Sequence, residues 1–261
     1  MKLLAERRRH PLALAALLLV GLLLTGGAYA LFTTTSTANA AEYTAADVEE
    51  GQKLFVTNCA TCHGMAAEGT DNGPGLVGVG AAAVDFQVGT GRMPLQMSGP
   101  QAQVKEPQFN QEQIDAMAAY VASLGPGPAV PEDEYLDTAQ GDAAVGGGLF
   151  RTNCAMCHNV VGAGGALTRG KYAPNLSEVS EKHLYEAMQT GPQNMPIFND
   201  ANLTPEQKRD VVTYVRTVAE TESPGGAKLG SLGPVAEGLF IWFFGLAAVI
   251  GITVWLAARS K

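Results

Sequence analysis

The sequence has little of what most catalytic and nucleic-acid-binding sites are built from. It contains only four cysteines and four histidines in 261 residues. It shows no Rossmann glycine pattern, no phosphate-binding P-loop and no cluster of metal-binding carboxylates. Basic residues are scarce in the middle, where residues 41–225 hold 10 Lys and Arg against 23 Asp and Glu, a net charge of -13. Because phosphate backbones are bound by clustered cations, we expect no nucleic acid as a partner.

The four cysteines all lie in one ten-residue stretch that occurs twice. The first copy is LFVTNCATCH, Leu54 to His63, and the second is LFRTNCAMCH, Leu149 to His158. Eight of the ten positions are identical, at an offset of 95 residues. Each copy ends in Cys-x-x-Cys-His, which is the attachment signature of a c-type haem.

The spacing within this motif fits haem chemistry. Two thiols three positions apart on a helical turn can each form a thioether with one vinyl group of a porphyrin, and the next residue, a histidine, can bind the iron. We therefore expect two covalently bound haem c groups. One is held by Cys59, Cys62 and His63, and the other by Cys154, Cys157 and His158. A redox dithiol, a zinc site or a disulfide would also use paired cysteines, but the matched flanks and the following histidines favour haem.

The composition favours two small haem-centred domains. Aromatic residues make up only 7% of the chain, whereas glycine and proline are frequent, with 31 and 14 residues. This predicts short helices joined by long loops, with each porphyrin supplying missing apolar bulk. We expect a mostly α fold with cytochrome domains at residues 45–126 and 139–223, joined by a proline-rich, acidic linker at 127–138.

Helical patterns frame each domain. A glycine and an aromatic lie four residues apart, and so on one helix face, at Gly51 with Phe55 and again at Gly146 with Phe150. This resembles small cytochromes c, and the resemblance implies that the first helix of each domain closely crosses the last; ordinary amphipathic spacing is the alternative. The last helices are predicted from QEQIDAMAAYVASL and PEQKRDVVTYVRTV, in which apolar residues recur at helical spacing.

Each haem iron needs a second axial ligand, and methionine is the usual one in electron transfer. Met93 and Met195 each precede a proline on the loop before the last helix, so we predict that they are these ligands. Met97 is an alternative to Met93. We interpret the other methionines of the two domains as packing residues: Met65, Met117, Met156 and Met188.

A Pro-x-Leu step follows each haem motif, at Pro74 and at Pro174. A backbone carbonyl at these prolines could accept a hydrogen bond from the second ring nitrogen of the haem histidine, which would orient the ring and tune the iron. A turn proline without an electronic role is the alternative. His183 lies in a polar helical pattern and is interpreted as a surface histidine.

Two apolar segments, residues 12–32 and 237–258, are long enough to span a membrane as helices, and residues 12–32 and 238–258 carry no charge. Their basic flanks, Arg7 to Arg9 and Arg259 with Lys261, lie on the outer sides. The positive-inside rule then predicts a multi-pass protein of the cell membrane, with both termini cytoplasmic and the haem domains on the extracytoplasmic side. The first segment also fits a cleaved signal peptide ending at Ala-Tyr-Ala or Ala-Asn-Ala.

These motifs together resemble tandem class I cytochrome c domains. The whole layout, with apolar segments at both ends, resembles the dihaem cytochrome c subunit of the actinobacterial cytochrome bcc complex, a menaquinol–cytochrome c reductase. The resemblance implies a cytochrome b subunit, a Rieske iron–sulfur subunit and a haem-copper terminal oxidase as partners. It implies that the chain relays electrons from the Rieske protein to the oxidase as part of a respiratory translocase.

Two other functions use similar haem motifs. A dihaem enzyme such as a peroxidase would leave one iron open to substrate. A dihaem electron-accepting subunit of a membrane dehydrogenase or oxidase would differ only in its partners. We expect no independent catalytic site, because protein ligands are predicted for both faces of both irons.

Overall fold

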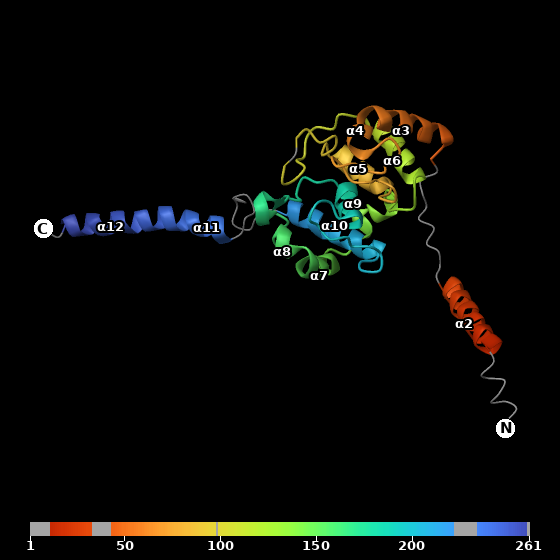
Figure 1. Cartoon of the computed structure of the whole chain (residues 1–261). Coiled ribbons are helices and arrows are strands. Elements are labelled where there is room, and N and C mark those ends of the chain that lie inside the picture. Colours follow the sequence, from red (N-terminus) through yellow and green to blue (C-terminus); the bar gives the residue numbers. More distant parts are fainter. Residues whose placement is uncertain (1–10, 33–42, 98, 222–233, 260–261) are drawn as a thin grey trace, which may run out of the picture. The chain divides into compact units, whose positions relative to one another are not determined.

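The computed structural model describes residues 11–32, 43–97, 99–221 and 234–259, and the chain divides into two units at residue 40. The N-terminal unit contains helix α2, Pro11–Phe32 (Figure 1). It covers the predicted segment 12–32 and consists of leucine, alanine and glycine with few other residues. The run is helical because alanine and leucine have the highest helix propensities. The flanking basic residues Arg7 to Arg9 lie outside the described residues.

The second unit begins with a cytochrome domain of four helices. These are α3 (Ala45–Asn58), α4 (Ala60–His63), α5 (Ala81–Gly89) and α6 (Gln111–Ser123). Helix α3 starts at a capping box in which the Thr44 hydroxyl accepts from the Asp47 amide and the Asp47 carboxylate accepts from the Thr44 amide. Asn110 and Gln113 form the same reciprocal cap on α6. Such caps satisfy amides that have no partner inside the helix.

The second cytochrome domain repeats this order. Its helices are α7 (Ala143–Asn153), α8 (Ala155–His158), α9 (Glu181–Thr190) and α10 (Pro205–Glu220). Between α8 and α9 lie the short antiparallel strands β1 (Gly165–Ala166) and β2 (Tyr172–Ala173), separated by the 3-10 turn η3 (Thr168–Gly170). The predicted mostly α architecture is confirmed.

The predicted close helix crossings are present in both domains. A Cβ atom on Gly51 of α3 would lie 1.9 Å from the Ala116 carbonyl oxygen of α6, and one on Gly146 of α7 would lie 1.9 Å from the Asp210 carbonyl oxygen of α10. Only a residue without a side chain allows the two backbones to approach this closely. The aromatic one turn later then packs on a tyrosine of the last helix. The ring centroids are 5.2 Å apart for Phe55 and Tyr120 and 5.3 Å apart for Phe150 and Tyr214.

The two domains contact each other through α5 and α9. The connecting segment 127–138 is extended at first and then forms the 3-10 turn η1, Asp133–Tyr135, before η2, Thr138–Gln140. It is attached at both ends, since the Pro128 carbonyl accepts a hydrogen bond from the Ala82 amide of α5, and Tyr135 packs against the second core. These contacts restrict how the domains can move relative to each other.

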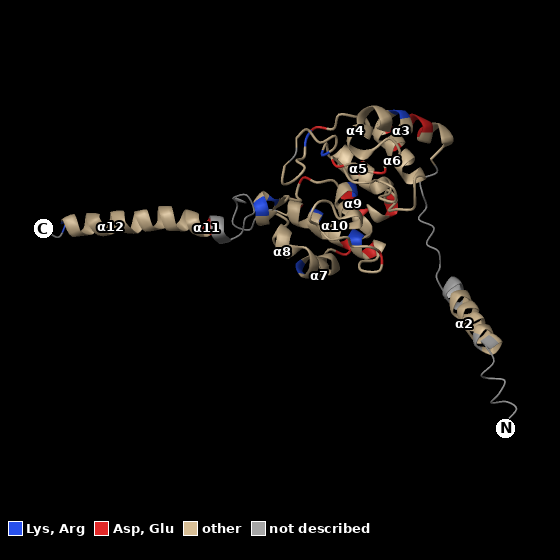
Figure 2. Ribbon diagram, viewed as in Figure 1, with Lys and Arg blue, Asp and Glu red and all other residues tan. Residues whose placement is uncertain are grey.

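A long apolar helical segment ends the described chain. It runs through α11 (Pro234–Phe240), the π-helical turn η5 (Ile241–Gly245) and α12 (Leu246–Arg259). Residues Glu237–Arg259 contain an 18-residue window with a mean hydropathy of 2.3 and are the one stretch among the described residues that is long and apolar enough to cross a membrane as a helix. Figure 2 shows α12 almost without charged residues. The apolar stretch found in α2, Ala15–Gly27, is shorter than a membrane span.

Candidate haem-binding sites

Both haem motifs form the same local structure. In the first domain Cys59 ends α3, and the amides of Cys62 and His63 both donate to its carbonyl, at 3.1 and 3.0 Å. In the second domain Cys154 ends α7 and accepts from Cys157 and His158 at 3.1 and 2.9 Å. All four thiols are free, and no disulfide joins them. The kink between the two helices places each pair of thiols and its histidine on one short turn.

Each haem-motif histidine is held by the proline of the following Pro-x-Leu step. The distance between His63 Nδ1 and the Pro74 carbonyl oxygen is 2.7 Å, and that between His158 Nδ1 and the Pro174 oxygen is 3.1 Å. A carbonyl oxygen can only accept, so Nδ1 carries the proton and donates it. The other ring nitrogen, Nε2, is then left with a lone pair, which is the state that an iron ligand requires.

Burial keeps the second histidine neutral and the first thiol of each motif protonated. Desolvation lowers the pKa of His158, and the hydrogen bond to Pro174 opposes this only in part. Burial, followed by the neighbouring motif thiol, raises the pKa of both Cys59 and Cys154 to about 11. Thioether formation would remove these groups from titration altogether.

A cavity of about 590 Å³ opens onto the second motif. Its wall includes Cys154, Cys157, His158 and Met195, together with apolar residues of the second core. The volume is in the range of cofactor pockets, which are mostly apolar with a few polar groups. Thiols, an imidazole and a thioether around one apolar cavity are the donor set that a c-type haem takes. The residues of this site therefore fit a haem.

The predicted methionine ligands lie on the same cores as the motif thiols. Met195 packs against the second core with Cys154 and Leu176. Met93 packs against the first core with Cys59 and Leu76, the leucine of its Pro-x-Leu step. Met97, the alternative to Met93, is 78% exposed. Of these two methionines, Met93 therefore lies against the core that Cys59 also contacts, and Met97 lies at the surface.

Two of the predicted packing methionines lie elsewhere than expected. Met117 and Met188 are buried, which confirms the prediction for them. Met65 and Met156 are 64% and 95% exposed, so the prediction that they pack in the core is wrong. Met156 lies on α8, between the two cysteines of the second motif, and Met65 lies two residues after α4.

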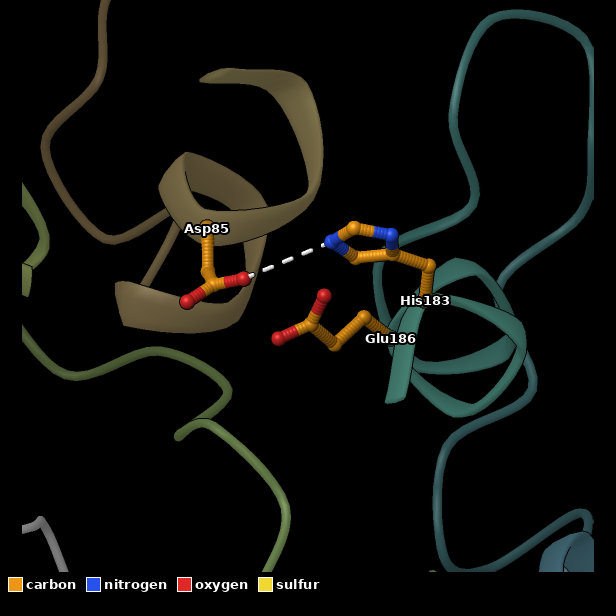
Figure 3. A group of neighbouring side chains, drawn as sticks. All are labelled: Asp85, His183 and Glu186. Carbon is orange, nitrogen blue, oxygen red and sulfur yellow. Dashed lines mark ion pairs between the residues drawn. The ribbon is translucent and has the colours of Figure 1, made fainter. Parts of the chain in front are cut away.

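A buried polar cluster lies between the domains and was not predicted. Figure 3 shows Asp85 of α5 facing His183 and Glu186 of α9. Asp85 and Glu186 have no exposed surface, and His183 Nε2 lies 3.6 Å from Asp85 Oδ1. His183 is half-buried, with 22% of its side chain exposed, so the interpretation as a surface histidine holds only in part, because α9 packs on the first domain. The helical pattern in the sequence did not show that the first domain covers this face of α9.

The charges of this cluster are balanced by a lysine and by a proton. Lys182 Nζ lies 2.6 Å from Asp85 Oδ2, and together with His183 it holds the pKa of Asp85 below its ordinary value in spite of burial. Burial, reinforced by the charge of Asp85, raises the pKa of Glu186 to about 9. Three candidate ligand atoms of Asp85, His183 and Glu186 lie within 4.8 Å of one another. A divalent cation there would add charge to a group that is already neutral, so we interpret the cluster as a carboxyl pair that retains a proton.

The raised pKa of Glu186 predicts a pH-dependent stability. Between about pH 4.5 and 9 the folded protein binds a proton there that the unfolded chain releases, so the free energy of unfolding falls as the pH rises through this window. The slope from this group is at most about 1.4 kcal/mol per pH unit. Urea unfolding measures this at pH 6 and pH 8.5. Between these two values the free energy of unfolding should fall less in Glu186→Gln than in the parent protein. Glu220→Gln, at an exposed position, should keep the parent slope; equal slopes in all three proteins would contradict the assignment.

Comparisons with known proteins agree with this geometry. A family model described as "Cytochrome c" matches residues 48–125, and one described as "Cytochrome C oxidase, cbb3-type, subunit III" matches residues 141–215. The "Cytochrome bc1 complex cytochrome c subunit" of Mycobacterium leprae is 47% identical over 94% of this chain and 87% of its own length. The protein of that name from Mycobacterium tuberculosis is 46% identical over 98% and 94%, respectively.

The chain belongs to the cytochrome bc1 complex cytochrome c subunit family. A further member, from Corynebacterium efficiens, is 46% identical over 82% of this chain and 77% of its own length. The predicted resemblance and the two tandem cytochrome c domains are confirmed. Membership supports an electron-transfer role with haem c, as a subunit of a reductase complex. The apolar C-terminal helix fits a membrane anchor of such a subunit.

Proposed function

We propose that this family member carries two covalently attached haem c groups and relays electrons between them. Cys59, Cys62, His63 and Met93 hold the first haem, and Cys154, Cys157, His158 and Met195 hold the second. The observation that supports this most strongly is the repeated site. In both domains the proline carbonyl fixes the histidine tautomer, and the predicted methionine shares a core with the first thiol.

The haem supplies one-electron chemistry at the iron, and the chain supplies its ligands and their surroundings. A thioether ligand favours ferrous iron and so raises the potential. The hydrogen bond from Nδ1 to Pro74 or Pro174 orients the imidazole and increases its basicity. If His63 with Met93 and His158 with Met195 held the two irons, neither iron would have a place for a substrate. This favours a relay over a peroxidase-like enzyme.

The names of the relatives support partners within a cytochrome bc1 complex. We propose that one haem accepts electrons from the Rieske iron–sulfur subunit beside cytochrome b, and that the other delivers them to a haem-copper terminal oxidase. The chain then contributes to a quinol–cytochrome c reductase without a catalytic site of its own. An electron-accepting role in a membrane dehydrogenase is the alternative, and the names of the relatives disfavour it.

We further propose that Glu237–Arg259 anchors the chain in the cell membrane, with Arg259 at the cytoplasmic end and the haem domains outside. In this arrangement α2 is a second span or the apolar part of a cleaved signal peptide. The N-terminal sequence of the purified mature protein separates these two, because cleavage would remove α2.

Purification through a C-terminal tag in mild detergent tests the proposed partners. We expect the reduced-minus-oxidised spectrum to show haem b and haem c together, the Rieske signal in electron paramagnetic resonance, and quinol oxidation activity. Haem a in the same preparation would show that the terminal oxidase co-purifies as well. Haem c alone, or with a flavin or molybdenum dehydrogenase, would overturn the proposed partners and leave the dihaem chain unaffected.

A further inference from the structure

Arg92 is a buried cation that has no counter-ion in the part of the chain that the structure describes. The residue is only 8% exposed, and its guanidinium carbon lies 4.7 Å from the centre of the Phe86 ring on α5. Within the described residues it makes no ion pair and no hydrogen bond. An aromatic face attracts a guanidinium but does not satisfy its five N–H groups. The Arg92 nitrogens are not among the fully buried unpartnered atoms, so they keep access to the cavity that Arg92 lines, where an anion can reach them. A guanidinium held largely away from bulk water is stabilised by such an anion.

The carboxylates of the domain interface do not provide that anion. Asp85, on the same helix as Phe86, is paired with Lys182 and also accepts from Gln111. Glu186 is neutral at physiological pH, since burial raises its pKa to about 9. Lys105, the other first-domain cation at this wall, donates to the Pro94 carbonyl at 2.9 Å. Arg92 is therefore the first-domain cation that remains available.

The cavity beside Arg92 belongs to the other domain's haem site. Arg92, Phe86 and Lys105 of the first domain line the same 590 Å³ cavity as Cys154, His158 and Met195 of the second. A c-type haem carries two carboxylates, the propionates, at one edge of the porphyrin. A planar guanidinium can bind a carboxylate through two parallel N–H groups, and such a pair is strongest where water is excluded.

We propose that the second haem site is shared between the domains, with Arg92 of the first domain binding a propionate of the haem that Cys154 and Cys157 hold. This inference rests on the proposed haem attachment. Arg92 directly precedes Met93, so one loop presents a ligand to the first iron and a cation to the second porphyrin. The haem thereby connects the two domains, and the arginine raises the potential of the second haem by opposing positive charge on its iron.

Redox titration of the purified full-length protein tests this assignment. Arg92→Gln should shift the ferrous-to-ferric ratio of the second haem about fivefold to tenfold toward ferric at a given ambient potential, where tenfold corresponds to 59 mV. Arg92→Lys keeps the positive charge but cannot bind a carboxylate through two parallel N–H groups. The second haem should therefore titrate close to the parent in this variant. The second haem is identified as the one whose titration also responds to Met195→Leu.

Lys53→Gln is the matched control, because it removes one positive charge from an exposed position on α3 of the same domain. It should leave both haems unchanged. A shift in the first haem alone would assign Arg92 to its own domain's porphyrin, and no shift in either would make it a packing residue on Phe86; either result overturns the proposal. If Arg92→Gln does not accumulate, an Arg92→Lys protein whose second haem titrates far below the parent would overturn it equally.

This test is independent of the proposed partners. It reads the potential of a haem within the chain, whereas the relay is tested by what co-purifies. If the parent protein lacks the methionine-to-iron charge-transfer band, the assignment of the methionine ligands has failed. This would be known before any arginine variant is made.

Discussion

Replacing Met195 with leucine is expected to leave the second haem attached and to lower its potential by on the order of 100 mV, within the roughly 0.8 V range that axial ligands control. The thioether sulfur stabilises ferrous iron, and leucine has no donor atom to replace it. Leucine has a similar volume, so the core around Cys154 and Leu176 should remain packed. Redox titration gives the potential, and oxygen-linked quinol oxidation should slow in parallel.

Met156→Leu is the control for this variant. Met156 lies within the second haem motif but is 95% exposed, so it should titrate like the parent. In the first domain the same comparison is made by Met93→Leu and Met97→Leu, and only the former should lower the potential of the first haem. An unchanged potential in Met195→Leu would exclude Met195 as the iron ligand.

Replacing Gly146 with alanine is expected to lower the free energy of unfolding strongly. The added Cβ would lie 1.9 Å from the Asp210 carbonyl oxygen and 2.4 Å from its carbon, which are backbone atoms that cannot rotate away. Helices α7 and α10 would have to separate, and the contact between Phe150 and Tyr214 would open with them. Overpacking of this kind costs about 3 kcal/mol. Urea unfolding of the purified protein, with its haem content, measures the effect.

Gly148→Ala is the matched control, on the same helix two residues further along. A Cβ at Gly148 meets nothing within 4 Å, so this change should be neutral or stabilise α7 by up to about 1 kcal/mol through helix propensity. Gly51→Ala should repeat the loss in the first domain, at Ala116. If Gly146→Ala and Gly148→Ala were equally stable, the close approach of α7 and α10 would not require glycine at position 146.

Local spacing in the sequence carried most of what could be predicted about each domain. The spacing of Gly51 and Phe55, repeated at Gly146 and Phe150, put each pair on one helix face. The likeness to small cytochromes c then implied the helix crossing. The Pro-x-Leu steps indicated where the carbonyls beside His63 and His158 would lie, since a short loop returns the chain to the motif that it follows.

Contacts between the domains were decided only by the tertiary structure. Asp85 and Lys182 are 97 residues apart, and Arg92 reaches a cavity whose thiols lie more than 60 residues further along the chain. Which face of α5 meets α9 depends on the packing of two complete domains, which no short pattern records. Sequence patterns alone were enough to predict two cytochrome c domains and to nominate the residues that would bind haem in each. The tertiary structure alone decided that they share a buried carboxyl cluster and one wall of the second haem cavity, because burial of charge depends on what the other domain covers.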